Sequence, residues 1–167
     1  GSLESLIVDT EISRLFLIPG DSLLPGTANL QFFVKNRIIS ELANLTADFV
    51  ILDLGSGSAY NTVDFFLSSS GGLVVTTPET TAILNAYSFI KTCLFRMLFR
   101  SFPAKSEERR FLQEFASNRI EGTRESFLSL VDSLGRLNEQ SGNTVRSKLG
   151  HFSPRVIINM GRTNEDL

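Results

Sequence analysis

The residues best suited to chemistry follow a single apolar run. The stretch ADFVILDLGSGSAYNTVDFF, residues 47–66, places Asp53 after apolar residues and continues into a turn containing Gly55, Ser56 and Gly57. A carboxylate at the end of a buried strand can hold a water of a magnesium ion, and a following glycine N–H can contact a terminal phosphate. The same turn could instead let the backbone approach S-adenosylmethionine. The letters DLGSG alone do not choose between the two ligands.

Further polar residues follow two other apolar runs. Pro78 and Glu79 end the run GLVVTTPE, and Asn159 and Arg162 lie in VIINMGR. Because ligands bind at the carboxyl ends of the strands in an open parallel sheet, we expect these residues near Asp53. Small, polar and acidic residues at such an edge suit a nucleotide with a metal ion better than an apolar ligand.

Each of three candidates also has a purely structural interpretation. Asp53 could cap the helix that follows it. Glu79 could be an acid that favours the start of a helix, and Asn159 could hydrogen-bond the backbone at the end of its strand. The sequence leaves these interpretations open beside the functional ones.

Four continuous apolar runs that end in turn residues predict the strands that would position these residues. Continuous rather than alternating runs are typical of strands covered on both faces in a parallel sheet. A fifth, shorter run is either a strand or a lead-in loop. We therefore predict an α/β fold with a parallel sheet of about four to five strands and flanking helices. The runs span residues 14–20, 48–55, 72–78 and 155–161, with the shorter one at 6–11.

Helical patterns separate the predicted strands. Residues 29–45 place apolar side chains at helical spacing and predict a crossover helix before the strand at 48–55. A longer segment, at about 80–150, predicts an insert of three helices and a short fourth. We interpret residues 3–167 as a single α/β domain with this helical insert, which is the candidate surface for a protein partner.

Composition restricts the function further. The chain has 167 residues, 42% hydrophobic and 20% charged, with a net charge of −2 and a pI of 5.5. This charge gives no general attraction to nucleic acid or a membrane surface. Cys93 is the only cysteine and His151 the only histidine, so an intrachain disulfide is excluded, a Cys/His metal site is unsupported, and a cytoplasmic location is expected. Charged and polar residues interrupt the apolar segment 82–99, which argues against a membrane span.

Four segments, LIPGD, DFVILDLGSG, GLVVTTPET and VIINMGR, occur in an order that resembles the MinD/ParA-type ATPases with a deviant P-loop, most of all their FlhG-type members. The resemblance covers most of the chain outside the helical insert. It implies a partial P-loop NTPase fold in a protein that uses ATP and magnesium as a dimerisation switch for spatial positioning, in cell division, partitioning or flagellar placement. It also implies a cytoplasmic protein, peripheral to the membrane in some members.

The resemblance implies a role for each candidate residue. Asp53 would be the catalytic acid on the magnesium shell, and Gly55, Ser56 and Gly57 would form the loop known as switch II. Pro78 and Glu79 would lie at the nucleotide edge. Asn159 would recognise the adenine ring, and Arg162 would flank it.

One departure from the family changes the activity expected of this chain. The family's KGGxGKT phosphate loop is absent, since no glycine here is followed by Lys-Ser or Lys-Thr. We therefore expect a portion of a longer ATPase that is inactive alone and binds no ATP or magnesium tightly. The loss of a central strand would leave a sheet edge unpaired, which predicts a homodimer.

Two alternatives from other classes remain. An S-adenosylmethionine-dependent methyltransferase would use DLGSG for its ligand, but it requires an acid roughly 20 residues further on, at the tip of the next strand. The first acid there is Glu79, which is 79 − 53 = 26 residues after Asp53 and follows a proline. The other alternative is a degenerate interaction module that keeps the sheet and binds no nucleotide.

Overall fold

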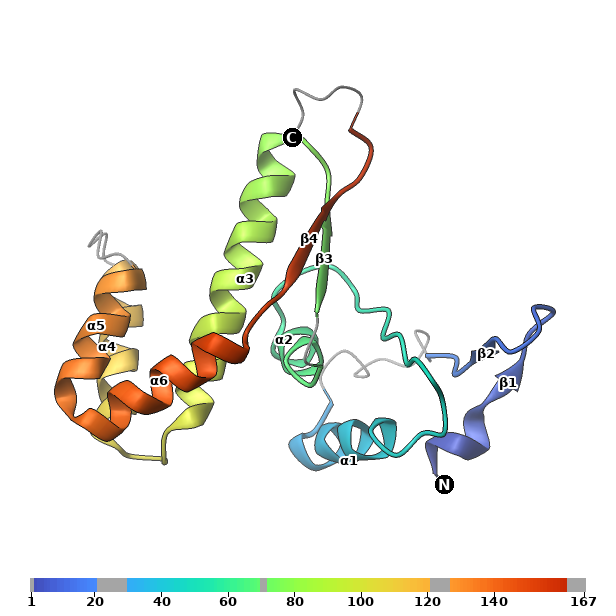
Figure 1. The fold of residues 1–167 in the computed structure, drawn as a ribbon, viewed down its shortest axis with the longest axis horizontal. Helices are drawn as coiled ribbons and strands as arrows, with labels where there is room; N and C mark the ends of the chain where they lie inside the picture. Colours follow the sequence, from blue (N-terminus) through green and yellow to red (C-terminus); the bar gives the residue numbers. More distant parts are fainter. Residues whose placement is uncertain (1, 21–29, 70–71, 121–126, 162–167) are drawn as a thin grey trace. The chain divides into compact units, whose positions relative to one another are not determined.

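The computed structural model describes residues 2–20, 30–69, 72–120 and 127–161. The chain divides into two compact units, Gly1–Ser68 and Ser69–Leu167, and each is considered by itself (Figure 1). The first unit contains the 3-10 helix η1 (Leu3–Leu6), β1 (Val8–Asp9), β2 (Phe16–Leu17), α1 (Phe32–Leu42) and α2 (Tyr60–Phe66). The second contains β3 (Leu73–Thr76), α3 (Thr80–Ser101), α4 (Glu107–Ile120), α5 (Phe127–Leu137), α6 (Glu139–His151) and β4 (Arg155–Ile158).

The predicted parallel sheet of four to five strands is wrong. Within the described ranges the chain is mostly helical, with six α-helices and two sheets of two strands each. The runs at 6–11 and 14–20 form β1 and β2, which pair antiparallel with Val8 opposite Leu17. Only β3 and β4 form a parallel pair. Four of the five apolar runs therefore contain a strand, but these strands do not pair in one parallel sheet.

The run at 48–55, which was expected to be a strand of the parallel sheet, has no partner among the described strands. Backbone groups of residues 49–57 make no hydrogen bond with other described backbone groups, and Phe49 and Ile51 are 89% and 90% exposed. A continuous apolar run becomes a buried strand only when neighbouring strands pair with its backbone and further layers cover its faces. Because neither is present among the described residues, the segment forms no ladder.

In the first unit, a buried ion pair joins α1 to α2. The ammonium group of Lys35 donates to the Asp64 carboxylate, and the two side chains are only 7% and 2% exposed. The predicted helix at 29–45 therefore exists, but its apolar residues do not define its buried face, since Phe33 is 82% exposed. Two buried charges are tolerated when each neutralises and hydrogen-bonds the other.

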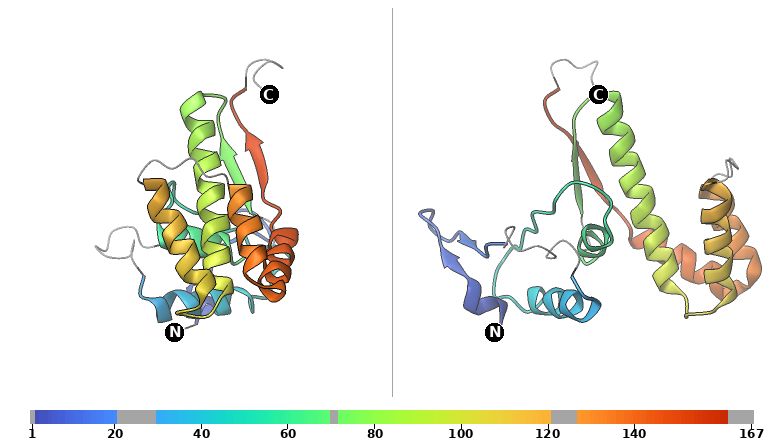
Figure 2. Two further views of the ribbon diagram at one scale, coloured as in Figure 1. Left: turned by 90° about the vertical axis from the view of Figure 1, so that its left-hand side faces the viewer. Right: turned by 180° about the vertical axis from the view of Figure 1, so that it is seen from behind.

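In the second unit, β3 and β4 lie side by side although helices α3–α6 separate them in the sequence. Leu73 aligns with Arg155 and Thr76 with Ile158. Val74 and Thr76 of β3 are buried, and α3 runs along the strand pair in both views of Figure 2. The alternate β3 residues, Leu73 and Val75, are 57% and 63% exposed. One face of this pair is thus covered by helix, as alternation along a strand requires, and the other is open.

The core of the second unit is formed by α3–α6. Its buried side chains recur at helical spacing, so that each helix turns one apolar face inward. They are Leu98, Phe102, Leu112, Phe115, Leu130, Leu134 and Val145. The predicted short fourth helix is a full helix, α6. One non-helical residue, Asn138, separates α5 from α6.

Polar contacts fix the ends of these helices. Arg109 Nε donates to the Phe99 carbonyl at 2.9 Å, which satisfies a carbonyl in the last turn of α3. Asn138 caps α6 by accepting from the Ser141 N–H at 2.7 Å. The Ser141 hydroxyl donates to Glu108 of α4, and this bond lowers the pKa of the Glu108 carboxyl. The capped start of α6 is thereby tied to α4.

By length and composition α3 is the one described helix that could also cross a membrane, with a mean hydropathy of 1.2 over its most apolar window. Core helices of soluble proteins meet the same criterion but are mostly buried, whereas 11% of this window of α3 is buried. Its contacts with β3, α4 and α6 make it the element on which the second unit is assembled.

Candidate functional site

Asp53 lies in the extended segment of the first unit. Its side chain is exposed and makes no hydrogen bond or ion pair with another described residue. The following helix, α2, has Ala59 at its N-cap and no side-chain cap, so the structure does not support Asp53 as a helix cap. An unpaired, accessible carboxylate of this kind can accept hydrogen bonds from metal-bound water.

The glycine turn after Asp53 is open. Gly55, Ser56 and Gly57 are exposed, and a Cβ built on either glycine would meet no atom within 4 Å. Gly57 has φ of +102°, a conformation that side chains disfavour. Glycine is therefore required at 57 by the backbone, whereas Gly55 leaves room for a ligand or another chain.

Pro78 and Glu79 connect β3 to α3 in the second unit. Glu79 is the N-cap residue of α3, with φ of −64° and ψ of 136°. Its carbonyl accepts from the Ile83 N–H at 3.0 Å, but its carboxylate makes no capping hydrogen bond. Pro78 is half-buried and Glu79 exposed. Glu79 thus marks the beginning of α3 without its side chain satisfying the helix end.

Asn159 directly follows β4. Its N–H donates to the Thr76 carbonyl at 2.8 Å, which extends the pairing of β4 with β3 by one residue. Its side-chain Oδ1 accepts from the Met160 N–H at 2.9 Å, as the structural interpretation of Asn159 expected. Its Nδ2 donates to no other described residue. The amide therefore keeps donors that could bind a ring nitrogen of a base.

The structure brings together one part of the predicted site. Because Thr76 aligns with Ile158, Pro78 and Glu79 follow one strand end and Asn159 follows its neighbour within the second unit. Asp53, Gly55, Ser56 and Gly57 belong to the first unit. Arg162 lies outside the described residues. Among the described residues, no group of three or more His, Cys, Asp or Glu side chains could hold a metal ion directly.

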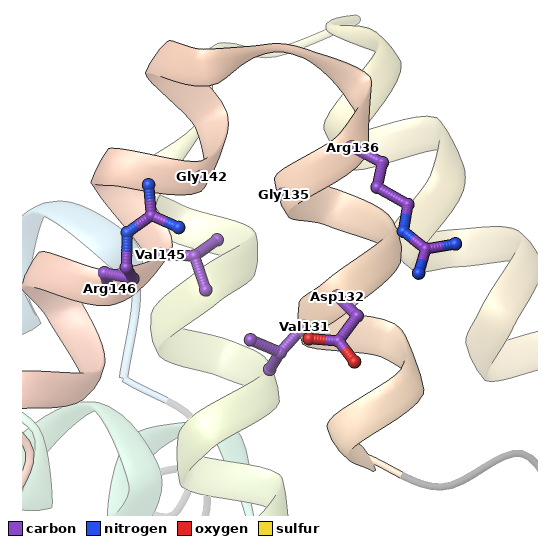
Figure 3. Close-up of a pocket in the computed structure, with 7 residues that line it drawn as sticks. All are labelled: Val131, Asp132, Gly135, Arg136, Gly142, Val145 and Arg146. Carbon is purple, nitrogen blue, oxygen red and sulfur yellow. The ribbon is translucent and has the colours of Figure 1, made fainter.

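Sequence reasoning missed a pocket between α5 and α6 (Figure 3). Its volume is about 470 Å³, and Figure 3 labels its lining, which is Val131, Asp132, Gly135, Arg136, Gly142, Val145 and Arg146. The two glycines permit close helix packing, since a Cβ on Gly142 would lie 3.3 Å from the Gly135 carbonyl oxygen. The signal in the sequence was this glycine pair, seven residues apart in a helical segment. No residue of the predicted nucleotide site lines the pocket.

Comparison with known proteins gives one partial relative. The chain is 34% identical over 96 residues to the flagellum site-determining protein YlxH of Helicobacter pylori (strain ATCC 700392 / 26695). The match covers 53% of this chain and 31% of that protein, so the chain spans about a third of its relative's length. No model of a known protein family matches the chain, and no solved structure matches it.

Proposed function

We propose that this chain is a portion of a MinD/ParA-like ATPase that takes part in placing flagella. The observation that carries the proposal is the 34% identity to a flagellum site-determining protein. The four motif segments, read without that comparison, point to the same family. In this proposal the complete protein is cytoplasmic, with a peripheral contact to the membrane, and it binds and hydrolyses ATP with magnesium to control its dimerisation.

The chemistry of the candidate residues suits this role. The exposed carboxylate of Asp53, which has no partner among the described residues, would accept a hydrogen bond from a water on magnesium. A backbone N–H in the turn Gly55, Ser56, Gly57 would contact the terminal phosphate. The Nδ2 donors of Asn159 would bind the edge of the adenine ring, beside Pro78 and Glu79. Arg162 would lie next to that ring. Bound magnesium would neutralise part of the phosphate charge.

The chain alone should neither bind ATP tightly nor hydrolyse it. Phosphate groups are usually held by consecutive backbone N–H groups and a lysine in a glycine-rich loop, and no glycine in this sequence is followed by Lys-Ser or Lys-Thr. We therefore place the phosphate cradle in the rest of the complete protein. The segment at 48–55 would pair with a strand of that part, or with a second copy of the chain. The open face of β3 and β4 would pack against the same partner.

The test is a substitution of the metal carboxylate in the complete protein. Asp53→Asn keeps the size of the side chain and removes its charge, so magnesium-dependent ATP hydrolysis should fall by roughly a hundredfold or more, as expected when a group that stabilises transition-state charge is lost. The matched control is Asp48→Asn, which lies at the other end of the same extended segment and forms an exposed ion pair with Arg14 at 3.2 Å. Exposed pairs contribute little to stability, so the control should hydrolyse ATP at the parent rate. Equal rates for the parent and Asp53→Asn proteins would overturn the assignment of Asp53.

A further inference from the structure

The pocket between α5 and α6 carries charged side chains that the proposed nucleotide site does not use. Arg136 of α5 and Arg146 of α6 line it together with Asp132, and all three residues are exposed. Arg136 and Asp132 make no hydrogen bond or ion pair with another described residue. Two guanidinium groups against one carboxylate make the pocket positive, although the whole chain has a net charge of −2.

Local packing holds one of the two arginines in place. Arg146 Nη2 donates to Asn143 Oδ1 at 2.8 Å, and it lies 3.4 Å from the position that a Cβ on Gly142 would take. A side chain at position 142 would therefore compete with this guanidinium group for space. Because its orientation is already fixed, Arg146 loses less conformational entropy when it binds a carboxylate.

Apolar side chains form the floor of the pocket. Val145 is 1% exposed and belongs to the core of α3–α6, and the half-buried Val131 packs against that core. In the view of Figure 3 both valines lie between the side chains of Arg136 and Arg146. Since these contacts all lie within the second unit, the folded chain itself forms the floor of the pocket.

We infer that the pocket between α5 and α6 binds an acidic, amphipathic segment of a partner protein. An apolar side chain of the segment packs on Val131 and Val145. Its carboxylates accept hydrogen bonds from Arg136 and Arg146, whose planar guanidinium groups suit that geometry. A hollow between two helices is a common docking place for a helical segment. The described residues that line the pocket include none from the proposed nucleotide site, so this inference goes beyond the proposed function and is independent of it.

The lining favours a peptide over nucleic acid or free phosphate. A phosphate backbone requires several lysines or arginines along its length, whereas the pocket offers two. Asp132 would repel a phosphate group, but its carboxylate can accept hydrogen bonds from the N–H groups of a peptide, which phosphate does not have. The apolar floor likewise has no counterpart in a phosphate ion.

The test uses the purified 167-residue chain, with a display library of random peptides of about 12 residues, roughly three helical turns, as the probe. Selections are run in parallel on the parent, on the double variant Arg136→Gln with Arg146→Gln, and on the control Arg110→Gln. Arg110 is an exposed arginine of the same unit, 3.9 Å from Glu107, and it does not line the pocket. Melting followed by circular dichroism checks that the three proteins are equally stable.

Peptides selected on the parent should be enriched in Asp and Glu beside an apolar residue, and Arg110→Gln should select the same peptides. The double variant should lose this enrichment. The most enriched peptide, labelled with fluorescein, should bind the double variant roughly tenfold or more weakly in anisotropy titrations, since two charge-assisted contacts are lost. Lysine at both positions should restore only part of the affinity, because it keeps the charge and loses the planar fork.

The results that would overturn the inference are distinct from a failure of the proposed function. Absence of acidic enrichment on the parent would contradict it, as would equal enrichment on the parent and the double variant. Binding of the parent, but not of the double variant, to vesicles of anionic phospholipid, without enrichment of acidic peptides, would assign the arginines to a membrane surface instead. A complete protein that binds no nucleotide would remove the proposed function and leave this inference standing.

Discussion

At the scale of single residues, the structure separates accessible polar groups from buried ones. Asp53 is exposed and has no partner among the described residues, which the proposed role on the magnesium shell requires. Lys35 and Asp64, in contrast, are buried against each other, so their charges serve the packing of α1 on α2. Burial raises the pKa of the Cys93 thiol to about 12, and this thiol is therefore protonated and unreactive near neutral pH.

The buried pair gives a prediction at this scale. Lys35→Met should lower the free energy of unfolding by about 3–5 kcal/mol, because it removes the ammonium group that neutralises the buried Asp64 carboxylate. The double variant Lys35→Met with Asp64→Leu should recover most of this loss, since it removes both charges. The measurement is urea unfolding of the purified chain.

Arg37→Met is the matched control on the same helix. Arg37 pairs with Glu41 at the surface, with side chains 65% and 25% exposed, and the loss of this pair should cost less than about 1 kcal/mol. If Lys35→Met and Arg37→Met unfolded at the same urea concentration as the parent, the pair would not hold α1 to α2.

The residue scale also shows what periodicity cannot predict. The helix at 29–45 was predicted correctly, but the buried position is Lys35, whereas Phe33 is exposed. The partner that buries Lys35 is 29 residues further along the chain, and a helical pattern contains no information about it. Asn159 was singled out as the residue after an apolar run, but its bond to the Met160 N–H depends on a positive φ that the sequence does not reveal.

At the scale of elements, apolar runs were easier to locate than to pair. The runs that became β3 and β4 were predicted from their apolar residues and turn endings, and each has the other as its partner. The run at 48–55 has the same composition and forms no ladder, because no other described strand lies beside it. Local composition indicates that a segment can be a strand, and only tertiary contacts decide whether it is one.

The exposed segment at 48–55 gives a prediction at this scale. A segment with unpaired backbone groups and exposed apolar side chains favours association with another strand. The purified chain, with a mass of 18.5 kDa, should therefore be a dimer at micromolar concentration by light scattering. Ile51→Asp should shift it to monomer by placing a charge on the 90% exposed position. Phe33→Asp, at an 82% exposed position on α1, should leave the dimer intact. A monomeric parent chain would contradict self-association through this segment.

At the scale of the whole molecule, the residues proposed to bind a nucleotide fall in both units of the chain. The strand ends that carry Pro78, Glu79 and Asn159 are neighbours in one unit, and Asp53 with its glycine turn belongs to the other. No phosphate-binding loop is present in the sequence. The chain also spans only 31% of the flagellum site-determining protein that it resembles. These observations together support a portion of an ATPase better than a complete enzyme.

The central claim is tested most directly by calorimetric titration of the complete protein, first with magnesium-ATP and separately with S-adenosylmethionine. We predict saturable binding of magnesium-ATP and no heat with S-adenosylmethionine, and the purified 167-residue chain should bind neither. Binding of S-adenosylmethionine by the complete protein would make the DLGSG turn a methyl-donor site and would contradict the ATPase proposal. Absence of binding to both ligands would also contradict it, and would favour an interaction module that binds no nucleotide.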